Sequence, residues 1–245
     1  MNTLLSPPRG RGAEILDAPD ADPGLARRSL RDVALANRLF GGARAVLDEL
    51  APLWDHLPRH ATLLDVGTGI GDIPARARAA AAHRGVQLET VGLEATASLT
   101  EANRGINTWL VCGDARRLPF ADHSVDVVTC SQVLHHFFDA DAHGVLSEMN
   151  RVARTRVIVS DLHRSRVAAA GIWLASFALG FHPTSRHDGV VSVMRGFHIA
   201  ELRQLVRDSL GIDASVRYRA AYRITASWTP TWTPSPTPAA SAVGP

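Results

Sequence analysis

The fold is decided by one stretch, Leu63-Leu64-Asp65-Val66-Gly67-Thr68-Gly69-Ile70-Gly71-Asp72, in which an apolar run leads into a glycine-rich turn. Glycines let the backbone approach a ligand closely, and in a parallel sheet ligands gather at the carboxyl end of the first strand. Three glycines taken alone can equally serve tight packing. Asp65 precedes the first glycine by two residues and suits an ammonium group better than a pyrophosphate. The third glycine stands one place too early for the dinucleotide fingerprint Gly-x-Gly-x-x-Gly.

Apolar runs typical of strands alternate with helical patterns on both sides of this turn. The runs lie at 62–66, 88–93, 108–112, 125–130 and 157–160. Strands that alternate with helices are joined by right-handed crossovers and form a parallel sheet covered on both faces. The sequence therefore predicts an α/β fold with a doubly wound sheet.

The segments outside this core divide into helices, a strand pair and two tails. Helical spacing of apolar residues predicts two short helices over 29–57, with a break at Gly41-Gly42, and further helices over 164–179 and 199–210. Residues 214–218 and 222–226 fit an antiparallel pair. Residues 1–22 and 228–245 are rich in proline and small residues, so we expect them to be disordered. One domain over 23–227 follows, with N-terminal helices 29–57, a core over 61–161, and helices and terminal strands over 162–227.

Composition excludes several classes of function. All 26 basic residues are arginine, which removes the lysine that Schiff-base chemistry, phosphate-binding loops and protein kinases require. A net charge of +2 without a basic run gives no sign of a nucleic-acid partner. Cys112 and Cys130 lack the spacing of a disulfide framework or zinc site. No apolar run reaches the ~20 residues of a membrane span, and the start lacks a signal-peptide pattern, so we expect a cytoplasmic protein.

An acidic residue also stands at or just after the end of each of the next two strand-like runs. Glu94 ends the second strand-like run, where a carboxylate can accept hydrogen bonds from both hydroxyls of a ribose. Gly113-Asp114-Ala115 follows the third. Each acid taken alone has a structural alternative, because Asp65 and Asp114 could cap turns and Glu94 could start a helix.

Taken in order and spacing, these segments resemble class I S-adenosylmethionine-dependent methyltransferases from residue 63 to about residue 160. The stretches SQVLHHF at 131–137 and EMNRV at 148–152 are most similar to the small-molecule branch that includes the ubiquinone and menaquinone biosynthesis methyltransferases. The resemblance implies a Rossmann-like, mostly parallel seven-stranded sheet with short N-terminal helices and a helical acceptor-side insertion. It also implies S-adenosylmethionine as the cofactor.

The resemblance further implies which residues hold the cofactor. Asp65 would face its ammonium, the glycine turn its methionine part, Glu94 its ribose, and Asp114 its adenine. The full expected set is Asp65, Gly67, Thr68, Gly69, Glu94, Ala95, Asp114, Ala115, Ser131 and Gln132, of which the last two would lie near the sulfonium.

Acceptor-side residues are expected at the carboxyl ends of the fourth and fifth strands. A hydroxyl acceptor needs a base for its proton, and histidine can supply one near neutral pH. The candidate catalytic residues are His135 and His136 after the fourth strand and His163 after the fifth. The alternatives are a structural histidine pair and, for His163, the first turn of a helix capped by Asp161.

Four residues are candidates for substrate binding: Arg38, Arg164, Trp173 and His187. Arg164 would orient an acidic or phenolic acceptor, and Trp173 belongs to an apolar stretch, 167–181, that would either line a lipophilic pocket or simply cover the sheet. Arg38 would reach the cofactor's carboxylate from a lid at 37–40. His187 lies in a predicted loop at 185–189.

The sequence thus predicts methyl transfer to a small lipophilic or aromatic acceptor, such as a phenol, quinol or polyketide-like compound, with oxygen favoured over carbon or nitrogen. No His/Asp/Glu spacing indicates a metal, so none is expected. A non-catalytic protein that binds the cofactor or a partner is one alternative. A nucleic-acid methyltransferase is disfavoured because residues 131–134 lack the Asn/Asp-Pro-Pro-aromatic segment. A nicotinamide oxidoreductase is disfavoured by the early third glycine and by Asp65. The oligomeric state is left open.

Overall fold

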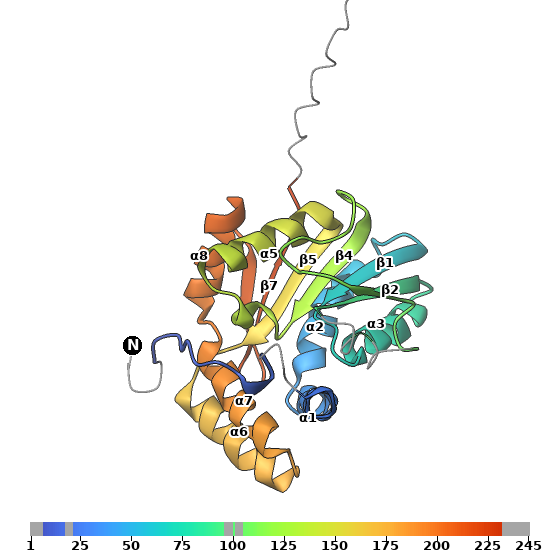
Figure 1. Cartoon of the computed structure of the whole chain (residues 1–245). Helices are drawn as coiled ribbons and strands as arrows, with labels where there is room; N and C mark the ends of the chain where they lie inside the picture. Colours follow the sequence, from blue (N-terminus) through green and yellow to red (C-terminus); the bar gives the residue numbers. More distant parts are fainter. Residues whose placement is uncertain (1–6, 18–21, 96–99, 101–104, 232–245) are drawn as a thin grey trace, which may run out of the picture.

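A seven-stranded sheet forms the centre of the computed structural model, which describes residues 7–17, 22–95, 100 and 105–231. The strand order is β3-β2-β1-β4-β5-β7-β6. The strands are β1 (His60–Val66), β2 (Gln87–Glu94), β3 (Trp109–Cys112), β4 (Val125–Ser131), β5 (Ala153–Leu162), β6 (Ser215–Arg219) and β7 (Arg223–Trp228). β1 to β5 are parallel, whereas β7 is antiparallel to both β5 and β6. The predicted doubly wound, mostly parallel sheet is confirmed (Figure 1).

Helices cover the sheet on both faces because successive side chains of a strand point in opposite directions. In β1, Leu64 packs into a cluster with α5 (Asp139–Val152) and α8 (Ile199–Leu210). Its neighbour Leu63 packs on the other face with α2 (Gly42–Leu50), the short helix η2 (Ala51–Leu53) and α3 (Asp72–Ala82). Both leucines are fully buried. Burial on both faces explains why these strands read as continuous apolar runs.

Three further helices gather below the sheet in Figure 1: α1 (Pro23–Leu39), α6 (Arg166–Ala178) and α7 (Pro183–Arg195). The predicted break at Gly41-Gly42 separates α1 from α2. Within the described ranges, no helix has the length and hydrophobicity that crossing a membrane requires.

Helix α7 contains residues 185–189, for which the sequence predicts a loop. Two local features start the helix: Pro183 stands in its first turn, and the His182 side chain accepts a hydrogen bond from the Thr184 amide. Gly189, which favours a turn on sequence grounds, instead lies where α7 packs on α6, with Ile172 Cγ1 3.6 Å from an added Cβ. Its small size therefore serves helix packing.

Residues 7–17, predicted to be disordered, lie against the ends of β5 and α7 and are called the strap below. The strap contains one short helix, η1 (Ile15–Asp17). Its backbone is held by two buried side chains: Arg164 donates to the Pro7 carbonyl at 2.7 Å, and Asp188 accepts from the amides of Ile15 and Leu16 at 2.8 and 3.2 Å. A proline- and glycine-rich composition disfavours helix and sheet, but it does not prevent distant side chains from fixing a segment.

Candidate active site

A cleft of about 610 Å³ opens where the strands β1 to β4 end. β1 and β4 are neighbours in the sheet, and the strand order reverses between them. Ligands of open α/β sheets bind at such a switch point. Every residue predicted to bind the cofactor lines this cleft.

The glycine turn after β1 wraps over the end of β2. The amides of Gly67 and Thr68 donate to the Leu93 carbonyl at 2.9 and 3.2 Å. Gly67 has φ +70°, and a Cβ added there would collide with Val133 Cγ2. Both the backbone conformation and the lack of space therefore require glycine at this position.

Glu94, at the end of β2, connects the turn to the cleft. Its Oε1 accepts a hydrogen bond from the Gly69 amide, and the residue is 6% exposed. Burial raises the pKa of Glu94 to about 7, although the hydrogen bond from Gly69 favours the charged form. The carboxylate therefore holds the turn in place, and it can also accept hydrogen bonds from a ligand in the cleft.

Asp65 lies deeper in the same cleft. Its Oδ1 accepts a hydrogen bond from the Thr129 hydroxyl at 2.7 Å. Burial raises the pKa of Asp65 to about 7. A positively charged ligand group beside it would offset the cost of burying the carboxylate.

Ser131 and Gln132 form the wall of the cleft at the end of β4. The Ser131 hydroxyl is buried and has no hydrogen-bond partner among the described residues. The Gln132 side chain donates to Asn37 of α1, so α1 is tied to the cleft through Asn37 and not through the predicted Arg38. The buried Ser131 hydroxyl, the acids Asp65 and Glu94 and the glycine turn together fit a ligand that carries an ammonium group and hydroxyls.

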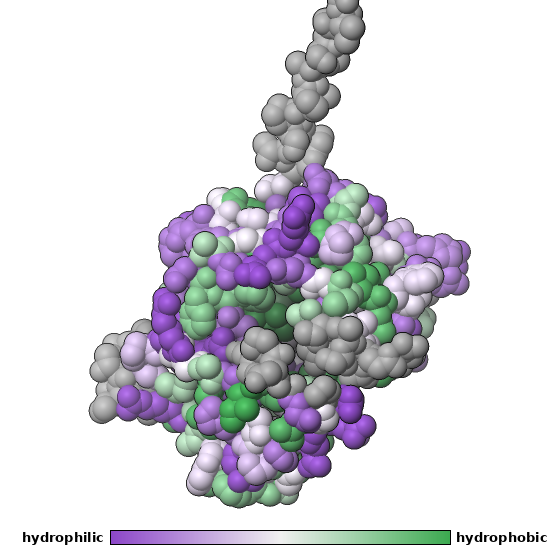
Figure 2. Space-filling model, in the orientation of Figure 1, coloured by the Kyte–Doolittle hydropathy of each residue, from purple (hydrophilic) through white to green (hydrophobic). Residues whose placement is uncertain are grey.

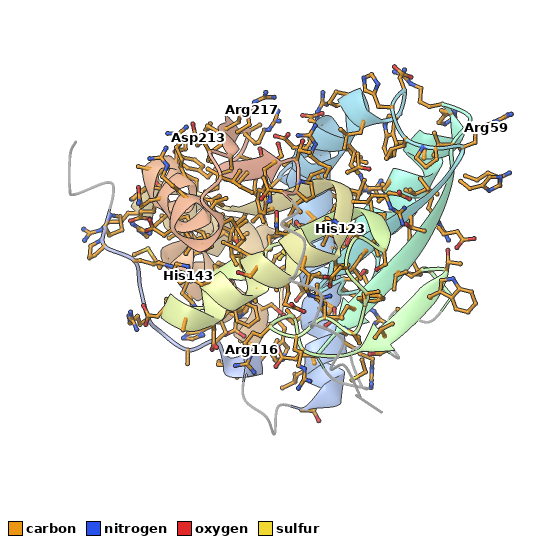
Figure 3. The ribbon with its side chains drawn as sticks, turned by 90° about the horizontal axis from the view of Figure 1, so that it is seen from above. Arg59, Arg116, His123, His143, Asp213 and Arg217 are labelled. Atoms are coloured by element: carbon orange, nitrogen blue, oxygen red, sulfur yellow. The ribbon has the colours of Figure 1, made fainter. Side chains whose placement is uncertain are left out.

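Asp114 stands at the mouth of the cleft in a charged pair. Arg116 donates to it at 2.8 Å and also lies 3.3 Å from Asp141, in the first turn of α5 (Figure 3). Hydrogen bonds from Arg116 lower the pKa of Asp114, which stays ionised at neutral pH.

A second cavity, of about 370 Å³, adjoins the cleft. Most of its lining is apolar and comes from α1, α6 and α7, for example Val33, Ala36, Ala168, Ile172 and Val193. Six residues line both cavities: Glu14, Leu16, Ser29, Val33, Gln132 and Ser192. Figure 2 shows that this face of the molecule is hollowed near its middle and that hydrophobic residues line the hollow. The two cavities therefore form one continuous site, which we divide into the cofactor cleft and the acceptor cavity.

Four ionisable side chains meet where the two cavities join, and we call them the junction cluster: Glu14, His135, His136 and Asp161. His135 Nδ1 lies 2.7 Å from Asp161 Oδ1, and the His135 amide donates to Asp161 Oδ2 at 3.1 Å. His135 Nε2 lies 3.5 Å from Glu14 Oε1, and His136 Nε2 lies 4.0 Å from Glu14 Oε2. Burial opposes a charge on His135, but the two carboxylates outweigh it and raise its pKa to about 9.

Glu14 belongs to the strap, and sequence reasoning missed it because nothing near it in the chain indicates a site. Its Oε1 accepts from the Ser192 hydroxyl at 2.8 Å and lies 3.4 Å from Arg195 Nη1. Asp188, which anchors the strap, also lines the acceptor cavity; it lies in the segment 185–189 that the sequence places near the acceptor, but there His187 was the predicted contact. Both residues acquire their positions only through tertiary contacts.

Two predicted residues lie near the end of β5 but line neither cavity. The His163 ring packs against those of His198 and Tyr218, with centroids 5.2 Å away in both cases. Arg164 is 2% exposed and donates to the Gly196 carbonyl and to Glu201, both at 2.6 Å. Arg164 thus contacts the strap and α8, and His163 contacts the start of α8 and β6, so both side chains point into structural packing and not toward the acceptor cavity.

The other three predicted substrate-binding residues also lie outside both cavities. Trp173 is 47% exposed and packs edge to face against Phe177 with centroids 4.9 Å apart, on the side of α6 that faces away from the cavity. His187 is exposed and lies 2.9 Å from Asp188, and Arg38 is exposed on α1. The apolar stretch does form a cavity wall, but through Ala168 and Ile172.

These features define the class I methyltransferase fold: parallel strands β1 to β5, a glycine turn and acid at the ends of β1 and β2, and an antiparallel β7 inserted between β5 and β6. A methyltransferase from Aquifex aeolicus, described as S-adenosylmethionine-dependent, has this fold. It superimposes with a TM-score of 0.58 at 16% identity, over 86% of this chain and 99% of that one. Residues 64–159 match the family model described as "Methyltransferase domain". Residues 64–159 are therefore similar to a methyltransferase domain, and the chain around them has the fold of S-adenosylmethionine-dependent methyltransferases.

Two curated relatives are similar over the same region. A malonyl-[acyl-carrier protein] O-methyltransferase from Xylella fastidiosa is 40% identical over 88 residues, which are 34% of this chain and 28% of that protein. A ubiquinone/menaquinone biosynthesis C-methyltransferase from Desulfotalea psychrophila is 36% identical over 104 residues, which are 40% of this chain and 39% of that protein. The matched segment thus spans well under half of either relative's length.

Proposed function

We propose that this protein transfers a methyl group from S-adenosylmethionine to a hydroxyl of a small lipophilic or aromatic acceptor, such as a phenol, quinol or polyketide-like compound. The observation that carries the proposal is the apolar acceptor cavity, which is continuous with the cofactor cleft. When bound, S-adenosylmethionine supplies a methyl group already activated on a sulfonium.

In this proposal the chain holds the cofactor with its own charges and amides. Asp65 pairs with the ammonium, the glycine turn contacts the methionine part, and Glu94 accepts from the ribose hydroxyls. Asp114 and the Ala115 amide hold the adenine, with Ala95 beside it. Ser131 and Gln132 lie at the end of β4, between the cleft and the junction cluster.

The acceptor side orients its substrate mainly by shape. Apolar walls from α1, α6 and α7 exclude water and favour an aromatic body, whereas the few polar groups at the junction fix one hydroxyl. Orientation of this kind lowers the barrier by about 7–11 kcal/mol in favourable cases. Proton removal from the hydroxyl falls to His136 of the junction cluster, because His135 already holds a proton between the carboxylates of Asp161 and Glu14. This is why we favour oxygen over carbon or nitrogen as the accepting atom.

The cofactor assignment is tested by calorimetric titration of S-adenosylhomocysteine, with NADH as a control ligand. Glu94→Gln should weaken binding about 10- to 100-fold, since a charge-assisted hydrogen bond contributes about 1.5–3 kcal/mol. Glu89→Gln is the matched control, because Glu89 is exposed on the same strand. Absence of binding by the folded wild type would overturn the cofactor assignment.

The acceptor assignment is tested by incubating a panel of phenols, quinols and polyketide-like compounds with isotopically labelled S-adenosylmethionine. Ala168→Phe narrows the acceptor cavity and should lower kcat/KM for bulky acceptors at unchanged S-adenosylhomocysteine affinity. Ala170→Phe, exposed on the same helix and outside the cavity, should leave both unchanged. Cofactor binding without transfer to any acceptor would favour a non-catalytic binding protein instead.

The domain boundaries expected from the sequence, 23–227, also remain a proposal, which we extend to include the strap. The strap supplies Glu14 and Leu16 to both cavities, so a methyltransferase without it would lack one wall of its site.

A further inference from the structure

We propose that Glu14, His135 and His136 bind a divalent first-row transition-metal ion at the point where the cofactor cleft meets the acceptor cavity. Each of these residues offers one ligand atom, and the three atoms all lie within 4.8 Å of one another. The binding site itself follows from this geometry alone. Its use in methyl transfer rests on the proposed function.

The spacing of the three groups matches what a metal ion requires. Metal–nitrogen and metal–oxygen bonds of about 2.0–2.2 Å place neighbouring ligand atoms of a tetrahedral site about 3.5 Å apart. One ligand atom from each of the three residues lies within 4.8 Å of the other two, and the contact from His136 Nε2 to Glu14 Oε2 is 4.0 Å. Only a small closure of the side chains is therefore needed. Two imidazoles and one carboxylate suit zinc, iron, cobalt or nickel and leave coordination positions open.

Asp161 prepares His135 to be a ligand. It is fully buried and accepts from the Leu162 amide at 2.7 Å, so its carboxylate is fixed by the backbone. It accepts a hydrogen bond from His135 Nδ1–H at 2.7 Å, which leaves Nε2 as the ligating atom. Metal-binding histidines are commonly oriented in this way by a carboxylate behind them.

His135 Nε2 provides an independent sign of a missing partner. The side chain is 2% exposed, and the buried Nε2 has no hydrogen bond of good geometry among the described residues; it has only the long contact of 3.5 Å with Glu14 Oε1. A buried polar atom without a partner is costly, and most such atoms in folded proteins are satisfied. This nitrogen faces Glu14, the position at which a metal would satisfy it.

Glu14 is oriented for one-oxygen coordination. Its Oε1 is held by Ser192 at 2.8 Å and by Arg195 at 3.4 Å, so Oε2 is the oxygen that remains for a metal. Arg195, and Arg9 bound to the His135 carbonyl at 3.2 Å, bring two positive charges near the site. These two positive charges equal the two negative charges of Glu14 and Asp161 in the junction cluster. We therefore expect affinity below that of a structural zinc site, whose ligands carry excess negative charge.

The position of the site indicates the substrate class. His135 and His136 line the cofactor cleft, and Glu14 lines both cavities. A metal held there would take the acceptor's hydroxyl oxygen, or two adjacent oxygens of a catechol-like or β-dicarbonyl acceptor, and lower the pKa of the bound hydroxyl. The proton passes to water and the oxygen bonds to the methyl carbon. The carbon–sulfur bond breaks with its electron pair kept by sulfur, so no oxidant or reductant is needed.

The test uses chelator-treated full-length protein titrated with Co²⁺ and, separately, Zn²⁺. Co²⁺ reports its coordination through its visible absorption, and elemental analysis after gel filtration gives the stoichiometry. We expect one equivalent per chain and nitrogen ligation. His136→Ala and Glu14→Gln should each weaken Co²⁺ binding at least 10-fold, and Asp161→Asn about 10- to 100-fold.

His143→Ala is the matched control, since His143 lies on α5 outside the junction cluster and bonds to Ser209 at 2.7 Å (Figure 3). It should bind Co²⁺ as the wild type does. To separate lost metal binding from lost folding, each variant is also required to show the circular dichroism spectrum and the cooperative urea unfolding of the wild type. Failure of the wild type to retain metal would overturn the inference, as would metal binding that is insensitive to His136→Ala and Glu14→Gln.

The same experiment separates this inference from the proposed function. If Co²⁺ does not bind while chelator-treated protein still methylates an acceptor, the metal site is wrong and the proposed function stands. If Co²⁺ binds through these residues but no acceptor is methylated, the metal site stands and the proposed function fails.

Discussion

Replacing Gly67 with alanine should destabilise the fold. The loss should exceed that of the same replacement at a glycine that also has a positive φ but has open space where the Cβ would lie. Gly67 has φ +70°, a conformation that costs a non-glycine residue about 1–2 kcal/mol. An added Cβ would also collide with Val133 Cγ2, and overpacking of this kind costs about 1–3 kcal/mol. The two effects together predict a loss of about 2–5 kcal/mol in the free energy of unfolding.

Gly85 provides the matched control. It has φ +73°, and an added Cβ there meets nothing within 4 Å, so Gly85→Ala should cost only the backbone part, about 1–2 kcal/mol. Urea denaturation followed by circular dichroism measures both variants. Val133→Ala introduced into Gly67→Ala should recover the packing part, as a double-mutant cycle would reveal. Equal losses for Gly67→Ala and Gly85→Ala would refute the reasoning, because the collision would then cost nothing.

Three further outcomes are expected. Burial raises the pKa of both Asp65 and Glu94 to about 7, so between about pH 4 and pH 7 the folded state binds more protons than the unfolded state. The free energy of unfolding should therefore fall as the pH rises through that window, by at most about 1.4 kcal/mol per pH unit for each carboxyl. Asp65→Asn and Glu94→Gln should each flatten this pH dependence, measured by urea denaturation. Arg164→Ala should lower the free energy of unfolding by about 3 kcal/mol in the same assay, because it leaves the buried groups that bind this side chain without a partner. The exposed control Arg166→Ala should change it by no more than about 0.5 kcal/mol. Equal effects of the two variants would contradict a structural role for Arg164. Asp188→Ala should speed amide hydrogen exchange in the strap and raise the acceptor KM at constant cofactor affinity, and unchanged exchange would show that this carboxylate does not anchor the strap.

The cofactor side of the site was predictable because its residues stand at the ends of strands. Glu94 and Asp65 terminate apolar runs, and parallel strands bring their carboxyl ends to one edge, so their order in the chain already implies proximity. The strands themselves followed from hydrophobic runs. β5 is the exception: it begins at Ala153, earlier than predicted, because its polar first half is held by backbone pairing with β4.

The acceptor side was less predictable because its positions depend on packing between distant elements. An apolar stretch predicts a helix near a lipophilic cavity, but it does not say which face of α6 turns inward, and so Trp173 was chosen where Ala168 and Ile172 are the lining residues. Glu14 gave no local signal, and the strap contact of Asp188 gave none either, since both residues reach these partners across more than a hundred residues. Charge and hydrophobicity patterns cannot register such contacts.

The strap should make the cofactor cleft and the acceptor cavity form at different stages of folding. Its hydrogen bonds join residues 126 to 186 positions apart in the chain, as in those of Arg9 to His135 and Arg195. Closing loops of that length is slow and entropically costly, whereas the cofactor cleft forms largely from neighbouring strand–helix units. The cleft should therefore form first during folding, and the strap should dock onto it late. On heating, the molecule should lose its acceptor cavity before it loses its cofactor cleft.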